Sequence, residues 1–383
     1  MDLKLRAMQQ DFLCRGSLFF RGARLRAEPA QCENYTGNEL FGKTGAPSSC
    51  RRAGRRGVAR IRLRIRAATI AGAIGNRGMN FILKLISLLP LAFIHKAGAF
   101  GGALAYRFGP RFRELLIQNM KGAGLDAERL APDVARQLGM QAMEMLWIWK
   151  TPSSRIMQLV QGDEVGMKRV HAALAAGKSA IFMTPHVGCF EITPIWGYED
   201  CLKQYGKSIV ILFRMPKMKW LQGFVAKSRE REGIVTAPAD LSGVRRIIRL
   251  MRDGHVFGSL PDQVPGRGEG VWVPFFGRLA YTMVFPLKTA KQFDAARFVV
   301  WSERIPGKGW KVFIREWVGE LTGDMHKDAA AMNRVIEQMI LKCPEQYIWN
   351  YNRYKHPAGA PMPTEQEKAM LASAASARQE ELL

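Results

Sequence analysis

The sequence predicts an α/β protein with a mixed central sheet flanked by helices and an N-terminal apolar helix that anchors the chain to a membrane. Between about residues 175 and 355, short apolar runs that end in turn or polar residues alternate with helical stretches. This alternation is typical of a sheet covered by helices. An apolar segment that begins at Met79 precedes this region. With 383 residues, 48% of them apolar, the chain can bury a large core.

Residues 1–78 show no sustained helical or strand period. They carry 16 Lys and Arg residues against 5 Asp and Glu residues. We interpret them as a poorly ordered Arg-rich extension that lies upstream of a native start at Met79. A nucleic-acid-binding arm is the alternative interpretation. A targeting peptide is disfavoured, because no apolar core is followed by a small-residue cleavage site.

Residues 79–110 are predicted to form the membrane anchor. Lys84, the pair His95-Lys96 and Arg107 divide this segment into two uncharged runs of ten residues. A helix that crosses a bilayer needs about 20 apolar residues, and Pro90 would bend such a helix. The pattern therefore favours an anchor that inserts shallowly, or spans the bilayer only marginally, over a clean crossing. A buried core helix is the alternative.

Residues 111–357 are predicted to form the principal domain. Up to about residue 175, apolar residues recur at three-to-four spacing, which indicates helices. The predicted strands are 179–183, 208–213, 255–260, 297–301 and 311–314. The predicted helices between them are 218–231, 242–253, 283–293 and 326–342. Residues 358–383, rich in Ala, Glu and Gln, are expected to form a frayed tail.

Charge and cysteine content restrict the possible functions. The net charge of +24 suits an anionic partner, which is a nucleic acid, a membrane surface or an acidic protein. None of the six cysteines forms a C-x-x-C pair, so neither a zinc site nor a redox motif is supported. The chain also contains no G-x-S-x-G motif, so a serine acyl-enzyme is not supported.

A histidine and a glutamate follow the apolar run 180–183. His186 and Glu191 are five residues apart, whereas a helical zinc pair uses histidines four apart. If Gly188 keeps His186 in a loop and Glu191 begins the next helix, the carboxylate can accept from one imidazole nitrogen. The other nitrogen is then free to remove a proton from a hydroxyl group. A structural His–Glu pair is the alternative.

Four segments follow one another in a specific order along the chain. They are His186–Glu191 as H-x-x-x-x-[DE], Phe213-Arg214-Met215-Pro216 with Ser228-Arg229-Glu230-Arg231, Leu260-Pro261-Asp262-Gln263 with the run 270–277, and the run 344–349 with Asn352-Arg353-Tyr354. On these residues the chain, from about 79 to 357, resembles the bacterial lipid A late acyltransferases, within the lysophospholipid acyltransferase superfamily. It differs from the family pattern at Ser228, where glycine is usual.

The resemblance implies transfer of a fatty acyl group from acyl carrier protein to a hydroxyl of a Kdo-bearing lipid A precursor. It places this reaction at the cytoplasmic face of the bacterial inner membrane, without a cofactor or metal. It implies that His186 is the general base, oriented by Glu191. It further implies that Arg229, Asp262 and Arg214 bind substrate; a guanidinium group suits a phosphate or another anion.

The residues leave three further questions open. The apolar segment 272–276, with Phe285 and Leu287, is expected to line the acyl pocket or to pack in the core. The acceptor could instead be a lysophospholipid or an amino-acid lipid. A cationic membrane-binding or nucleic-acid-binding protein without catalysis is the alternative from another class, although the resemblance implies no nucleic-acid partner. That alternative predicts loss of function without residues 1–78, whereas the enzyme hypothesis predicts that a chain starting at Met79 stays active.

Overall fold

The structure, a computed structural model, describes residues 78–213, 228–266 and 268–371. Almost all of the predicted extension 1–78 lies outside the described residues. So do Arg214 and most of the predicted helix 218–231, together with the end of the predicted tail. The account that follows concerns only the described ranges.

A seven-stranded sheet forms the centre of the fold, in the order β1-β9-β8-β2-β5-β3-β4. Its strands are β1 (Val160–Gln161), β2 (Ala180–Met183), β3 (Ile209–Phe213), β4 (Ile234–Pro238), β5 (Val256–Ser259), β8 (Ala296–Ile305) and β9 (Gly309–Glu316). Every neighbouring pair is parallel except β8 and β9, which form an antiparallel hairpin. The predicted mixed sheet is therefore confirmed, although β1 and β4 were not predicted.

Each face of this sheet carries its own layer of helices, because alternate residues of the strands point to opposite sides. Ile181, Val210 and Phe257 belong to one hydrophobic cluster, and their immediate neighbours along the chain belong to the other. The helices of the first face are α10 (Leu241–Arg252), α11 (Phe285–Gln292) and α12 (Met325–Lys342). The helices of the second face are α6 (Ser153–Met157), α7 (Glu164–Ala175) and α8 (Ile192–Asp200). The turn η1 (Leu202–Tyr205) follows α8.

A two-stranded hairpin and a short turn complete the C-terminal half of the fold. The hairpin of β6 (Gly270–Phe275) and β7 (Arg278–Met283) packs against α12, where Asn333 Nδ2 donates to the carbonyl of Pro274 at 2.8 Å. The turn η2 (Pro344–Gln346) follows α12 and brings the chain back toward the loop after β2. The residues of the last family segment therefore lie next to those of the first.

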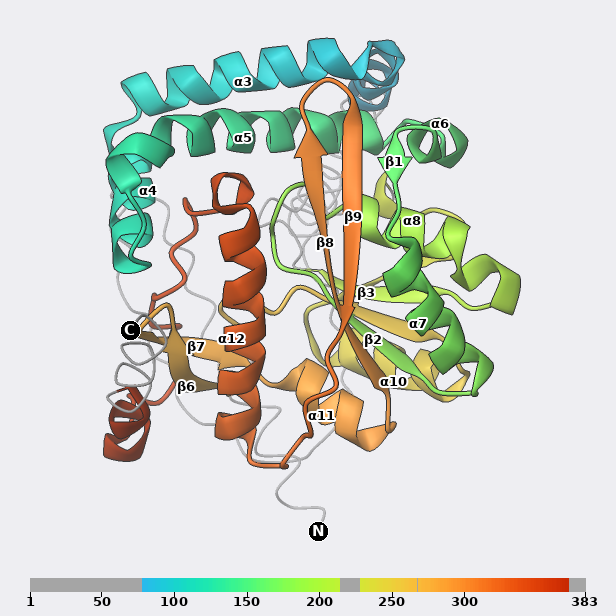
Figure 1. The fold of residues 1–383 in the computed structure, drawn as a ribbon, viewed down its shortest axis with the longest axis vertical. Coiled ribbons are helices and arrows are strands. Elements are labelled where there is room, and N and C mark those ends of the chain that lie inside the picture. The colour runs from blue at the N-terminus through green and yellow to red at the C-terminus, as the bar shows by residue number, and fades with distance from the viewer. Residues whose placement is uncertain (1–77, 214–227, 267, 372–383) are drawn as a thin grey trace, which may run out of the picture. The chain divides into compact units, whose positions relative to one another are not determined.

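The N-terminal helices form a separate layer along one edge of the sheet (Figure 1). They are the helix Gly78–Leu88, α3 (Leu91–Phe108), α4 (Pro110–Gly122) and α5 (Ala127–Ile148). Helix α3 packs closely on α5 because small residues face each other; a Cβ added to Gly98 would lie 2.5 Å from the carbonyl oxygen of Gly139. The predicted helix bend at Pro90 is confirmed, since α3 begins directly after it.

Among the described helices, no single one is both long and apolar enough to cross a membrane. The helix Gly78–Leu88 and α3 meet these requirements only as a pair, with a bend of 113° between them. Their exposed face is nevertheless apolar: Phe81, Phe93, Phe100 and Phe108 are 57–72% exposed. Trp147 of α5, on the protein side of this layer, is fully buried.

Candidate active site

His186 lies in the loop between β2 and α8, and its imidazole pairs with a buried carboxylate. Its Nδ1 is 2.8 Å from Oδ1 of Asp262, and its backbone N–H donates to Oδ2 of the same residue at 2.9 Å. Asp262 is completely buried and follows β5, which is the parallel neighbour of β2. Because parallel strands end at the same edge of a sheet, the two residues meet there although they are 76 positions apart.

Asp262 is held in its ionised form. Burial on its own would raise the pKa of the Asp262 carboxyl, but electrostatic attraction to the imidazole of His186 and the two hydrogen bonds from that residue hold the pKa below its usual value. Arg353, also buried, contributes a further attraction. The hydroxyl of Tyr347 hydrogen-bonds to the same carboxylate, and burial together with the charge of Asp262 raises the pKa of that hydroxyl well above its usual value.

An ionised Asp262 accepts the proton on Nδ1, so the lone pair of the imidazole of His186 is on Nε2. The amide Nε2 of Gln263 lies 3.2 Å from this atom and donates to it. Gln263 lines the same pocket as His186, and so the free nitrogen of the ring faces a space that a substrate can enter. The arrangement can therefore accept a proton from a hydroxyl that takes the place of the Gln263 amide.

Glu191 has a different partner from the one that the sequence predicted. Among the described residues, the imidazole of His186 contacts Asp262 and Gln263, whereas Glu191 forms an ion pair with Arg229 at 2.5 Å between Oε1 and Nη2. The predicted orientation of the ring by Glu191 is replaced by orientation through Asp262. The physical reason is that Glu191 immediately precedes α8, where its side chain meets Arg229 across the pocket.

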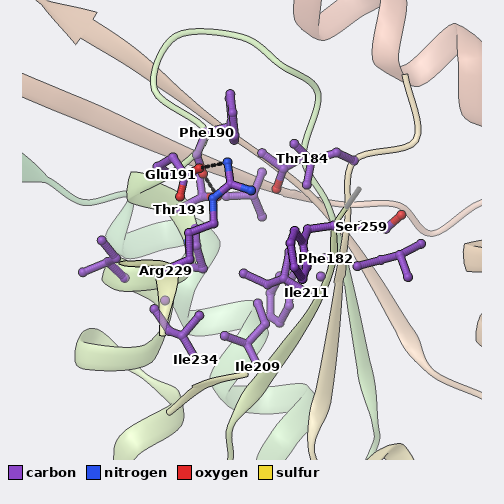
Figure 2. Close-up of a pocket in the computed structure, with 18 of the residues that line it drawn as sticks. Phe182, Thr184, Phe190, Glu191, Thr193, Ile209, Ile211, Arg229, Ile234 and Ser259 are labelled. Carbon is purple, nitrogen blue, oxygen red and sulfur yellow. Dashed lines mark hydrogen bonds and ion pairs between the residues drawn. The ribbon is translucent and has the colours of Figure 1, made fainter. Parts of the chain in front are cut away.

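A pocket of about 520 Å³ extends from this site into the molecule. Figure 2 shows Glu191 and Arg229 facing each other toward one end, and Ile209 and Ile234 toward the other. Most of the deeper lining is apolar and comes from β3, β4, α7 and α8. Of the two alternatives for the segment 272–276, core packing is confirmed: its aromatic side chains pack with α12 and the C-terminal segment, and none of them lines the pocket.

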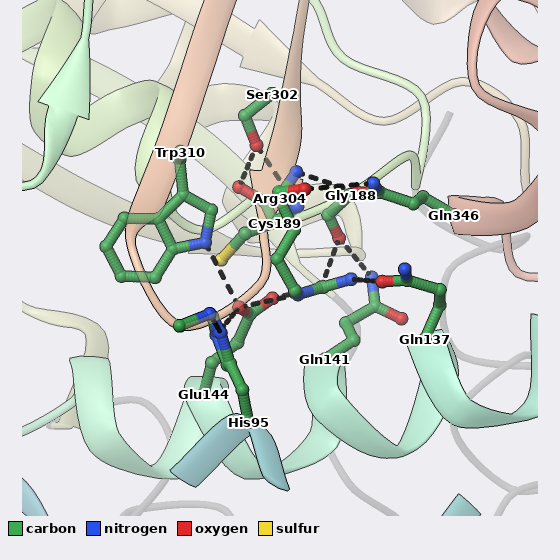
Figure 3. Close-up of polar contacts among 11 residues, drawn as sticks. His95, Gln137, Gln141, Glu144, Gly188, Cys189, Ser302, Arg304, Trp310 and Gln346 are labelled. Atoms are coloured by element: carbon green, nitrogen blue, oxygen red, sulfur yellow. Dashed lines mark hydrogen bonds and ion pairs between the residues drawn. The ribbon is translucent and has the colours of Figure 1, made fainter. Parts of the chain in front are cut away.

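The loop that carries His186 is fixed by hydrogen bonds at its centre (Figure 3). The carbonyl of Gly188 accepts from Gln141 Nε2 at 2.9 Å and from Arg304 Nη2 at 3.3 Å. The Oγ of Ser302 accepts from the Cys189 N–H at 3.1 Å and donates to the Cys189 carbonyl at 2.6 Å. Gly188 also has φ +57°, and a Cβ there would lie 1.6 Å from the Ser302 carbonyl oxygen, which only glycine avoids.

A buried ion pair supports this loop from below. Glu144 on α5 accepts from the guanidinium of Arg304 on β8, with Nε at 2.8 Å, and both side chains are almost fully buried. His95 of α3 and Trp310 of β9 also reach Glu144, each at 3.0 Å. Since the N–H of Gly307 donates to His95 Nδ1, the ring must donate to Glu144 through Nε2.

Cys189 lies inside the motif but is buried, and burial with the nearby charge of Glu144 raises the pKa of its thiol well above the usual value. A thiol in this state is a poor nucleophile. The structure thus brings together His186, Glu191, Arg229 and Asp262, whereas Arg214 lies outside the described residues. The sequence analysis did not single out Gln263, although it directly follows Asp262 in the third family segment.

Two comparisons with known proteins give relatives of this chain. The family model for bacterial lipid A biosynthesis acyltransferases matches residues 75–356, most of the chain. Among curated proteins, the chain is similar to a lipid A biosynthesis lauroyltransferase of Escherichia coli K12, with 25% identity over 291 residues, 73% of this chain and 91% of the relative. A lipid A biosynthesis palmitoleoyltransferase of the same organism is also 25% identical, over 72% of this chain and 89% of the relative.

Proposed function

Because the chain belongs to the bacterial lipid A biosynthesis acyltransferase family, and is thus an acyltransferase, we propose that it transfers a fatty acyl group from acyl carrier protein to a hydroxyl of a Kdo-bearing lipid A precursor. The observation that carries this proposal is the pair of His186 and buried Asp262 at an apolar pocket. A base beside an acyl-sized cavity is what transfer to a hydroxyl requires.

In the proposed reaction, the acceptor hydroxyl replaces the amide of Gln263 beside Nε2 of His186 and gives its proton to that nitrogen. Asp262, ionised and hydrogen-bonded to Nδ1, stabilises the imidazolium that forms. The acceptor oxygen attacks the thioester carbonyl carbon, a new C–O bond forms, and the C–S bond then breaks. The departing thiolate takes the proton from the imidazolium, so the base is regenerated.

The tetrahedral intermediate needs hydrogen-bond donors near its oxyanion. The Gln263 amide is a donor already within 3.2 Å of Nε2, and after displacement it stays in the same pocket. We assign it to the oxyanion. Arg229, held by Glu191, presents the positive charge that an anionic acceptor or the phosphate of the carrier arm would meet. Arg214 remains a proposed substrate-binding residue from the family resemblance alone.

The fatty chain is proposed to extend into the deep part of the pocket. Ile209, Ile211 and Ile234 form much of that wall together with Phe182 of β2 (Figure 2). Burial of the chain against these side chains supplies about 0.8 kcal/mol per CH₂ group. Such binding energy favours a long acyl group over a short one, although the pocket residues do not fix its length.

Transfer is proposed to occur at the cytoplasmic face of the inner membrane, with the helix Gly78–Leu88 and α3 embedded shallowly in the bilayer. Their exposed phenylalanines point away from the protein, and α3 packs on α5, which also holds the catalytic loop through Gln141. The base therefore lies close to the layer that would meet lipid. A lipid acceptor would reach the pocket without leaving the membrane.

The proposed function predicts acyl transfer in a defined mixture. Purified protein, lauroyl- or palmitoleoyl-acyl carrier protein and a Kdo-bearing lipid A precursor should give an acylated product detected by mass spectrometry. Parallel reactions with a lysophospholipid or an amino-acid lipid in place of the precursor test the alternative acceptors. Product only in one of those reactions would reject the lipid A acceptor, and absence of transfer in all of them would reject the proposed function.

The proposed anchor predicts weaker membrane binding when its aromatic face is made polar. Combined replacement of Phe93, Phe100 and Phe108 by serine should weaken binding to phosphatidylglycerol vesicles by about tenfold or more, because each buried aromatic contributes roughly 1.5–3 kcal/mol. Sedimentation with vesicles measures this. The matched control replaces three exposed apolar residues outside the anchor, Val318, Leu341 and Met362, by serine. Equal binding of the two variants would contradict the proposed anchor.

A further inference from the structure

Helix α10 presents a dense cluster of arginines to the surroundings. In the twelve residues Leu241–Arg252 it carries Arg245, Arg246, Arg249 and Arg252, all exposed, and no acidic residue. Within the part of the chain that the structure describes, none of the four forms an ion pair; Arg246 donates to the carbonyl of Thr236 at 2.9 Å. Arg245, Arg249 and Arg252 follow one another at helical spacing, so their charges form one stripe.

The apolar side of α10 is already occupied. Gly243, Ile247 and Met251 are buried against the sheet, and a Cβ on Gly243 would lie 1.8 Å from the Pro238 carbonyl oxygen. A basic helix that binds a bilayer needs a free apolar face to insert. α10 has no such face, and its exposed apolar contribution is limited to Leu241, which is 74% exposed at the start of the helix.

Helix α10 lies away from the helices that are proposed to contact the membrane. Its first residue follows Thr236 and Ala239, which line the pocket, and from there the helix runs back along the sheet. Figure 1 shows α3 and α5 along the top edge and α10 in the lower half of the view, beneath the sheet. When the aromatic face of α3 contacts lipid, α10 lies away from that layer.

We propose that this arginine stripe, with Leu241 at its head, is the docking surface for the acidic carrier protein that delivers the acyl thioester. The proposal rests on the proposed function, which requires a water-soluble protein donor. An acidic protein is complementary to four exposed guanidinium groups that form no ion pair with the described residues, and such complementarity raises the association rate and fixes orientation. The start of α10 follows Ala239 of the pocket lining, so a carrier docked on the stripe would use its flexible arm to bring the thioester to His186.

The test reverses the charge of the stripe and compares it with an equal reversal elsewhere. The variant combines Arg245→Glu, Arg249→Glu and Arg252→Glu. The matched control combines Lys327→Glu, Arg334→Glu and Lys342→Glu, three exposed basic residues on α12. Both variants change the net charge of the protein equally. For each, kcat and KM are measured with lauroyl-acyl carrier protein and with lauroyl-pantetheine, which has the thioester but no protein.

The expected result is a rise of about tenfold or more in KM for the carrier-protein donor in the α10 variant, decreasing at high salt. KM for lauroyl-pantetheine and kcat should stay within about twofold of wild type, as should all constants of the α12 variant. Equal KM values for the carrier protein in both variants would overturn the proposal. So would equal losses with both donors, which would indicate a structural effect.

Binding measurements distinguish binding of the carrier protein to the stripe from binding of lipid. They also distinguish failure of the docking proposal from failure of the proposed function. Titration of unacylated acyl carrier protein should show weaker binding to the α10 variant than to the α12 variant. If only binding to phosphatidylglycerol vesicles is weakened, the stripe contacts lipid and the proposal is wrong. If wild-type protein transfers nothing from acyl carrier protein, the proposed function fails, and the titration alone then decides whether the stripe binds the carrier.

Discussion

Replacement of His186 by alanine is expected to lower the rate of acyl transfer by about 10²–10⁴-fold while the protein stays folded. Among the described residues that line the pocket, His186 is the only one with a basic nitrogen whose ring is hydrogen-bonded to a buried carboxylate. Without it, the acceptor hydroxyl must ionise unaided. Steady-state rates with the carrier-protein donor and the lipid A precursor measure the loss, and thermal unfolding checks the fold.

Two further variants make this prediction specific. Asp262→Asn should reduce transfer nearly as strongly, because an amide no longer stabilises the imidazolium and can favour the wrong tautomer. His255→Ala serves as the control, since that histidine accepts from the backbone N–H of Ser208 and does not line the pocket. Transfer at the wild-type rate by His186→Ala would end its assignment as the base.

A chain starting at Met79 should retain the activity of the full chain.

The partner of His186 shows how far the sequence could lead. A carboxylate five residues away was the only candidate that spacing could suggest, yet the imidazole pairs with Asp262, 76 residues away. The contact depends on the sheet order, which places β5 directly beside β2. The sequence did place Asp262 at the end of an apolar strand. A neighbour relation between non-consecutive strands has no local signal, so the pairing itself could not be predicted.

Local hydrophobic patterns predicted where the strands lie better than they predicted what each segment packs against. The strands near 180, 209, 256, 297 and 311 were predicted and are confirmed, because each is a short buried apolar run. β4 was missed, since it directly follows charged residues of the second family segment. The apolar run 272–276 was expected either to line the acyl pocket or to pack in the core. Aromatic residues suit a core equally well, and only the packing against α12 distinguishes the two.

The ion pair between Glu144 and Arg304 had no signal in the sequence, and its loss should be the largest effect on stability. Arg304→Gln alone should lower the free energy of unfolding by about 3–5 kcal/mol, because Glu144 is then left charged in a fully buried place. The double variant Glu144→Gln, Arg304→Gln removes both charges and keeps hydrogen-bonding groups. It should lose less than the sum of the two single variants. Urea unfolding of all four proteins measures this.

The same pair predicts how stability depends on pH. Burial favours the neutral acid, but the charge and hydrogen bonds of Arg304, with those of His95, lower the pKa of the Glu144 carboxyl from 4.5 to about 2. A folded-state pKa below the unfolded one stabilises the fold above pH 4.5, and this contribution is lost as the pH falls toward 2. The difference is about 3 kcal/mol. Wild type should therefore lose its stability advantage over the double variant between these pH values. If the difference between wild type and the double variant were the same at both ends of the range, Glu144 would not be ionised in the folded protein, and Arg304 would donate to a neutral carboxyl group.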